Sequence, residues 1–218
     1  MREDVDMEDA AGEATWVLEA HGLTLVRVPT RRQPSTDHTL RQLIARVATV
    51  PTDDVELSWR CPECGARHGT PTVEYPVRGS GAPWYADAVS AAGVVYAGAG
   101  SKHPFALAMT VEPLVAQVVD EVSFHANEIA WLATLDDAER SAQRTAVWAR
   151  KAALARALRH RTFLEPARIE LTPADDRGIA RLARSVPEFG TSWSKIELHD
   201  LPSADGFAVA VAVLPSAR

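Results

Sequence analysis

The longest helical pattern in the sequence lies in the second half of the chain. Small and apolar residues recur from residue 138 to residue 158, and Asp136 and Asp137 stand just before them. Acidic side chains are favoured at the start of a helix because its N-terminus carries a partial positive charge. Thr134 is the predicted N-cap, and a shorter helical segment at 127–133 precedes it. The rest of this half must therefore pack around one long helix.

Short segments rich in β-branched residues, or with alternating polarity, predict strands on both sides of this helix. The predicted strands are residues 23–28, 55–59, 72–75, 94–96, 105–110, 114–119, 169–171, 196–198 and 207–214. A helix is predicted to start at 34–37, because four apolar residues follow it at helical spacing. These residues are Leu40, Leu43, Ile44 and Val47. A short helix is predicted at 86–92, and residues 98–104 are predicted as a loop between strands.

Each half of the chain thus contains helices and about three predicted strands, which indicates an α+β fold of two small packed lobes. Residues 1–15 are predicted to be an acidic, disordered leader. The N-terminal lobe is expected at 16–111 and the C-terminal lobe at 112–218.

The charge and hydropathy of the chain exclude several classes of protein. The 218 residues carry a formal net charge of −6, which argues against a general nucleic-acid binder because such proteins present a basic face. Neither an apolar run of about 18 residues nor the pattern of a signal peptide is present. We therefore expect a cytoplasmic protein that does not interact with membranes.

Both cysteines belong to one short motif, Cys-Pro-Glu-Cys, with Cys61 and Cys64 at its ends and His68 four residues further on. This spacing fits a metal or redox site, but a structural zinc ion takes four ligands and only three are at hand. Gly69 and Pro71 follow and indicate a turn. We interpret the motif as a tight turn between two strands and do not expect zinc, with metal binding as the alternative.

Three stretches of the sequence resemble a known protein family. The first, residues 61–71, reads Cys-Pro-Glu-Cys-Gly-Ala-Arg-His-Gly-Thr-Pro, and the second, 148–156, reads Trp-Ala-Arg-Lys-Ala-Ala-Leu-Ala-Arg. The third, residues 205–212, reads Asp-Gly-Phe-Ala-Val-Ala-Val-Ala. In order and spacing they are similar to motifs of the 4'-phosphopantetheinyl transferase superfamily (holo-acyl-carrier-protein synthase type, two-lobed single-chain class). The resemblance covers roughly residues 20–214.

The resemblance implies a pseudo-twofold pair of lobes, each a short β-sheet with helices, and an active site in the cleft between them. The implied reaction transfers phosphopantetheine from coenzyme A to a serine of an acyl or peptidyl carrier protein. It requires Mg²⁺ to offset charge at the phosphorus, carboxylates to hold this ion, and a base for the serine proton. The family also implies a monomer.

The resemblance places the metal and catalytic residues on a strand and on the long helix. The family's Gly-x-Asp-x-Glu strand is aligned with residues 116–120, so Val118 replaces the first carboxylate and Asp120, a shorter acid, replaces the second. Asp120 is thus implied as the metal ligand and as a catalytic residue, and Lys151 is the implied catalytic lysine. Ala152 stands where the family has its third carboxylate.

The implied coenzyme A site is also altered. Ser101, Lys102 and His103 align with the family's Ser-His-Ser loop, and Arg156 takes the place of a lysine on the helix. Thr70 replaces the lysine of the family's Gly-Lys-Pro turn, so a cation that would meet the phosphates is lost.

The second half also contains a run of basic residues, which suits either a solvated helix face or a surface that binds an acidic partner. The run consists of Arg140, Arg144, Arg150, Lys151, Arg156, Arg159 and Arg161. Two functions stay open on the sequence alone. The chain is either a divergent transferase that uses coenzyme A and Mg²⁺, or a catalytically inactive homologue that serves as a carrier-protein-binding or scaffold subunit.

Overall fold

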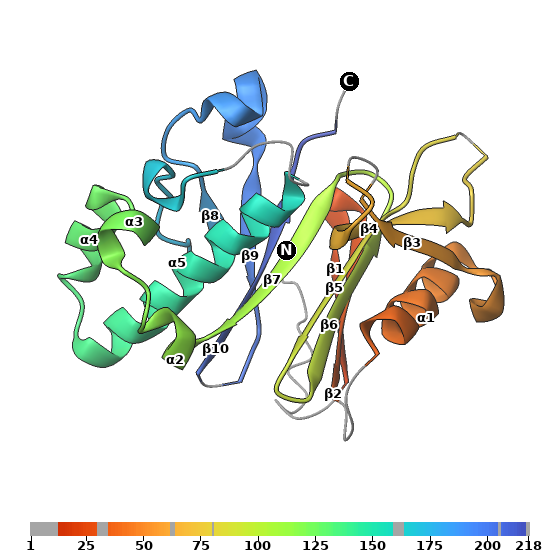
Figure 1. The fold of residues 1–218 in the computed structure, drawn as a ribbon, viewed down its shortest axis with the longest axis horizontal. Coiled ribbons are helices and arrows are strands. Elements are labelled where there is room, and N and C mark those ends of the chain that lie inside the picture. The colour runs from red at the N-terminus through yellow and green to blue at the C-terminus, as the bar shows by residue number, and fades with distance from the viewer. Residues whose placement is uncertain are drawn as a thin grey trace. The chain divides into compact units, whose positions relative to one another are not determined.

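The structure, a computed structural model, describes residues 13–29, 35–61, 64–79, 81–158, 164–204 and 206–216. The chain divides into two compact units, Met1–Pro104 and Phe105–Arg218 (Figure 1). The fold is mixed α/β, with an antiparallel sheet of six strands in the first unit and one of four strands in the second. The division falls before the predicted boundary at residue 111, so the strand that begins at Phe105 belongs to the second unit.

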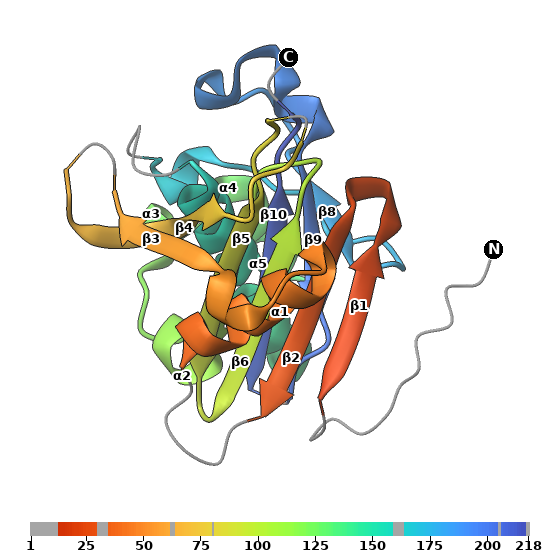
Figure 2. The same ribbon diagram turned by 90° about the vertical axis from the view of Figure 1, so that its right-hand side faces the viewer.

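The first unit is a curved antiparallel sheet with one long helix on its face (Figure 2). In the order β1-β2-β6-β5-β4-β3, its strands are β1 Ala14–Leu18, β2 Leu23–Pro29, β6 Val94–Gly100, β5 Tyr85–Ala91, β4 Arg67–Tyr75 and β3 Glu56–Arg60. The helix is α1, Thr36–Ala48, and short 3₁₀ turns lie at Glu19–His21 and Thr52–Asp54.

Helix α1 forms where the sequence predicts it. The Ser35 side chain caps it by accepting a hydrogen bond from the His38 N–H at 3.1 Å. The predicted apolar stripe supplies Leu40, Leu43 and Ile44 to the core, where they meet alternate residues of β5 and β6. The small side chains of Ala97 and Ala99 on β6 let the helix lie close to the sheet.

The second unit is a four-stranded antiparallel sheet covered by the longest helix (Figure 1). Its strands, in the order β7-β10-β9-β8, are β7 Phe105–Val111, β10 Phe207–Val213, β9 Glu197–Leu201 and β8 Ile179–Arg181. Its helices are α2 Glu112–Val115, α3 Asp120–Ser123, α4 Ala126–Leu132 and α5 Asp137–Ala157, with 3₁₀ segments at Pro166–Arg168 and Pro187–Lys195. The core lies between α5 and one face of the sheet, where Ala108, Ala210 and Ala212 of the strands meet Ala149 and Ala153 of the helix.

Several predicted elements are wrong. The helix predicted at 86–92 is strand β5, because pairing with β4 and β6 outweighs the helix propensity of its alanines. The strand predicted at 114–119 is helix α2 and a turn, since Pro113 occupies the first turn of α2, where a missing N–H costs nothing. The strand predicted at 169–171 has only an isolated bridge between Leu171 and Leu182. Strand β6 continues through Gly100, which shortens the predicted loop.

The ends of two predicted segments also differ. The N-cap of α5 is Asp136, whose carboxylate accepts from the Glu139 N–H at 2.9 Å, whereas the Thr134 hydroxyl donates to the Trp131 carbonyl. Residues 1–12 of the predicted leader lie outside the described residues, and its last two residues belong to β1. No helix in the described ranges is long and apolar enough to cross a membrane.

Candidate functional site

Lys151 lies on α5 in a buried ion pair. Its ammonium group donates to the Glu128 carboxylate at 2.5 Å, and both side chains are only 2% exposed. It also donates to the carbonyls of Pro166 and Ser123 at 2.9 and 3.2 Å, and lies 5.6 Å from the centre of the Phe124 ring. An ammonium group has three N–H donors, and here all three are used. Lys151 thus links α3, α4, α5 and the 3₁₀ turn at Pro166.

Glu128 is held as firmly as its partner. One carboxylate oxygen also accepts from the His125 N–H at 2.8 Å, which completes a capping box on α4, and the other accepts from the Leu171 N–H at 2.9 Å. Burial lowers the pKa of Lys151, and the nearby Glu128 charge offsets only part of this effect. The pair therefore has a structural role, because it connects α4 and α5. It includes the lysine that was predicted to be catalytic.

Asp120, the predicted metal ligand, is the first residue of α3 and not part of a strand. One of its oxygens accepts from two nitrogens of Arg144, at 2.6 and 3.0 Å. Arg144 also donates to the carbonyls of Val115 and Val118 and lies 5.2 Å from the Phe124 ring centre. Arg144 therefore ties the segment from α2 to α3 onto α5, with Asp120 as one of its anchors. Val118, which the alignment placed two residues before Asp120 on the same strand face, lies in the turn between α2 and α3.

The strands of this unit that face α5 are β7 and β10, whereas residues 116–120 form no strand. Ala108 of β7 is buried in the same apolar cluster as Ala149 and Ala153 of α5, and Ala152 packs against this cluster. Alternate residues of a strand share a face, so Ala106, Ala108 and Thr110 are on the same side of β7. Strand β7 contains no carboxylate on either face.

The predicted coenzyme A residues Ser101, Lys102 and His103 form the turn between β6 and β7. The Ser101 carbonyl accepts from Arg78 at 3.2 Å. The alkyl chain of Lys102 lies over Gly22, and the His103 ring meets the His21 ring edge-on, with 5.5 Å between their centres. These side chains therefore contact the turn between β1 and β2.

The basic run on α5 is largely neutralised by neighbouring acids. Arg140 pairs with Asp137 at 3.0 Å, and the buried Arg150 pairs with Asp200 through two nitrogens, at 2.8 and 2.5 Å. Arg144 and Lys151 have the partners given above. Arg156 is half-buried, and Arg159 and Arg161 lie outside the described residues. Four of the seven basic residues of the run are therefore in ion pairs within the second unit.

The described residues of the cysteine motif lie between β3 and β4, and hydrogen bonds between residue 61 and residues 65 and 66 form the predicted turn. The Gly65 N–H donates to the Cys61 carbonyl at 2.8 Å and the Cys61 N–H to the Ala66 carbonyl at 2.9 Å. Cys61 is buried and Cys64 is exposed, and they do not form a disulfide. The His68 side chain, the third candidate ligand, lies outside the described residues.

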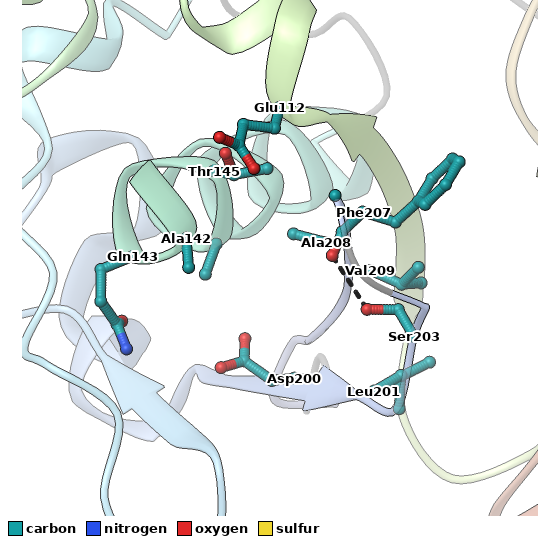
Figure 3. A pocket seen from close by; sticks show the side chains of 12 residues that line it. Glu112, Ala142, Gln143, Thr145, Asp200, Leu201, Ser203, Phe207, Ala208 and Val209 are labelled. Carbon is teal, nitrogen blue, oxygen red and sulfur yellow. Dashed lines mark hydrogen bonds between the residues drawn. The ribbon is translucent and has the colours of Figure 1, made fainter. Parts of the chain in front are cut away.

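The second unit contains a cavity of about 240 Å³ at the end of its sheet where β9 turns into β10 (Figure 3). Two carboxylates, Glu112 and Asp200, face it from opposite sides, with Gln143 and Thr145 of α5 between them. The other lining residues are Ala142, Ala146, Leu201, Ser203, Gly206, Phe207, Ala208 and Val209.

Most polar groups of this cavity are already fixed by hydrogen bonds. Asp200 is held from behind by Arg150, and Glu112 accepts from the Ser141 hydroxyl at 2.5 Å. The Thr145 hydroxyl donates to the Ser141 carbonyl at 2.9 Å and the Ser203 hydroxyl to the Phe207 carbonyl at 3.0 Å. Both hydroxyl protons are thereby used, so these oxygens can offer the cavity only lone pairs.

Sequence reasoning missed both carboxylates of this cavity, although each had a local signal. Glu112 follows a strand directly and precedes a proline, which marks the start of a helix. Asp200 lies two residues after the buried Leu198 on β9, so both residues are on the core-facing side of the strand. A carboxylate at such a position requires a partner. The partner, Arg150, is 50 residues away in sequence, so the pair itself had no local signal.

Comparison with known proteins assigns no relative: no protein-family model matches the sequence, and no curated protein matches it.

Proposed function

We propose that this chain is a non-catalytic relative of the 4'-phosphopantetheinyl transferases that binds an acyl or peptidyl carrier protein without modifying it. The observation that supports this most is the apolar cluster between β7 and α5. Ala152, which stands where the family has its third carboxylate, packs against this cluster, and the apolar side chains there offer Mg²⁺ none of the oxygen ligands it takes.

The fate of the remaining chemical groups supports the same proposal. Lys151 has no N–H left for a phosphate, because its three donors are bound to Glu128 and two carbonyls. Asp120 is held by Arg144. A Mg²⁺ ion that bridges a pyrophosphate needs several oxygen ligands from the protein and the substrate, and these two residues do not supply them.

The partner in this proposal is the one that the sequence resemblance implies, and the surface of the second unit offers a place for it. Leu114, Val119 and Val122 are 62%, 59% and 60% exposed on one short segment that spans α2 and α3. Clustered large apolar side chains on a surface are typical of protein interfaces. In this proposal the two units are the two lobes of the family, and the protein is a cytoplasmic monomer.

Transfer is tested by incubating the full chain with apo carrier proteins, coenzyme A and Mg²⁺ and measuring the intact mass of each carrier. We expect no carrier to gain a phosphopantetheine group, while an active transferase modifies the same carriers in parallel. A gain of mass would show an active enzyme and refute the non-catalytic part of the proposal. Calorimetry with coenzyme A should show no binding that Mg²⁺ strengthens.

Carrier binding is tested separately, by calorimetry of the full chain with the same apo and holo carriers. We expect binding that Leu114→Asp or Val122→Asp weakens. Val17→Asp is the matched control, because Val17 is also exposed, at 52%, but belongs to β1. The carrier proposal is refuted if no member of the panel binds, or if all three variants weaken binding equally.

A further inference from the structure

The cavity between α5 and the β9–β10 turn points to a ligand of definite charge. It is lined by Glu112 and Asp200, and none of its lining residues is a lysine, arginine or histidine (Figure 3). Arg150 neutralises Asp200 from behind, through both carboxylate oxygens. Among the residues that the structure describes, the neutral Ser141 hydroxyl is the side-chain partner of Glu112. The cavity therefore keeps one uncompensated negative charge.

The hydrogen-bonding groups of the cavity walls are mostly acceptors, so they favour the same kind of ligand as the negative charge does. The hydroxyl protons of Thr145 and Ser203 are bound to main-chain carbonyls, so their oxygens can only accept from a ligand. Of the lining side chains in the described part of the chain, Gln143 is the one that has N–H donors for a ligand. An anion such as a phosphate would meet carboxylates and lone pairs here, whereas a cation with several N–H groups would find acceptors.

The shape of the cavity favours an organic cation over a metal ion. Mg²⁺ and Ca²⁺ take six or more oxygen ligands, but this cavity offers two carboxylates, and both oxygens of one are already occupied by Arg150. The remaining wall is apolar, from Ala142, Ala146 and Ala208 with Leu201 and Val209. A volume of about 240 Å³ suits a molecule of a few carbon atoms rather than a bare ion.

We propose that this cavity binds a small aliphatic primary amine in its ammonium form. The ammonium group is held at the Glu112 carboxylate and donates its other hydrogens to the lone pairs of the walls. The alkyl part lies against the alanines of α5 and β10. This inference does not rest on the carrier-binding proposal, and either can fail without the other.

The test is a titration of the isotope-labelled full chain with n-butylammonium, followed by amide chemical shifts. Uncharged n-butanol and anionic butyrate serve as ligands of similar shape. We expect butylammonium to shift the amides of residues 142–146 and 206–209, with a dissociation constant in the millimolar range, on the order expected for so few atoms. Butanol should bind more weakly, and butyrate should cause no shifts at these amides.

Two variants test separately the negative charge of Glu112 and the free volume of the cavity. Glu112→Gln keeps the shape and should weaken butylammonium binding by about tenfold, as for the loss of a charged hydrogen bond. Glu121→Gln is the matched control, because it removes an exposed acid that does not line the cavity. Ala142→Leu fills the cavity without changing its charge and should abolish binding, and the amide spectrum of each variant shows that it is folded.

Three results would overturn the inference. The first is equal binding of butylammonium and butanol. The second is equal affinity in the parent chain and Glu112→Gln. The third is a set of shifts at residues 142–146 that appears with Mg²⁺ or Ca²⁺ and never with butylammonium, which would make the cavity a metal site.

Discussion

The buried pair of Lys151 and Glu128 leads to a prediction that separates a structural role from a catalytic one. Both side chains are 2% exposed, and their charged atoms are 2.5 Å apart. Removing one partner of such a pair leaves the other charge buried without compensation, which costs about 3–5 kcal/mol. We therefore expect Lys151→Met and Glu128→Gln each to lower the free energy of unfolding of the second unit by about this amount.

The double variant Lys151→Met/Glu128→Gln is the decisive member of the cycle. It contains no buried charge at this position, so its cost should fall short of the sum of the two single costs by at least about 2 kcal/mol. Native-state hydrogen exchange of the α5 amides measures the free energy in this unit. Lys195→Met, at an exposed lysine of the same unit, is the control and should change it little. Additive single costs, or a loss below about 1 kcal/mol in Lys151→Met, would refute the structural role.

The pH dependence gives the same pair a second test. Burial lowers the pKa of Lys151 from its ordinary 10.5 more than Glu128 raises it. The unfolded chain therefore binds this proton more tightly than the folded one, so the Lys151 contribution to stability rises as the pH increases from the folded-state pKa towards 10.5. We expect this rise in the parent chain and its loss in Lys151→Met. The same slope in both proteins would assign it to another group.

Three further predictions concern other contacts. Arg144→Met removes hydrogen bonds to an aspartate and two main-chain carbonyls and should cost about 2 kcal/mol in urea unfolding; a loss near zero would refute its anchoring role. Gly100→Ala would place a methyl group 2.8 Å from the Gly22 carbonyl oxygen, so we expect a loss of about 1–3 kcal/mol, and a fully stable variant would contradict this packing. The Asn127 side chain is the main cause of the lowered pKa of Glu170, so Asn127→Ala should raise that pKa in a carboxyl NMR titration; an unchanged pKa would exclude this hydrogen bond as the cause.

An element was predicted correctly from the sequence where its apolar periodicity and its capping residues indicate the same helix. Helix α1 has both a capping serine and an apolar stripe, and α5 has aspartates at its start, so local signals were sufficient. Strand β5 was mistaken for a helix because its alternation of Ala86, Asp87 and Ala88 is short and alanine-rich. Only its two neighbouring strands, which come from other parts of the sequence, stabilise the extended form.

The candidate site was harder to predict than the fold, because its residues meet over long sequence separations. The alignment identified Lys151 and Asp120 as chemically able groups, but it could not show that Glu128 and Arg144 lie beside them. Those partners are 23 and 24 residues away. The cavity at Glu112 and Asp200 is also built from residues far apart in the sequence, because a strand end, a helix face and a turn form it together.

A lysine that resembles a catalytic residue can therefore remain in a chain for a reason unrelated to catalysis. Lys151 satisfies a buried carboxylate, the buried Ser123 carbonyl and the partly buried Pro166 carbonyl, and a side chain without three donors would leave some of these acceptors unpaired at a cost of about 1–3 kcal/mol for a buried one. The side chain of Ala152, its neighbour, has no polar group that needs a partner, and a small apolar residue there extends the core. A small apolar residue at position 152 thus costs the fold little stability, whereas loss of Lys151 would disrupt the junction of α3, α4 and α5. The presence of Lys151 is consequently evidence for the fold and not for the reaction.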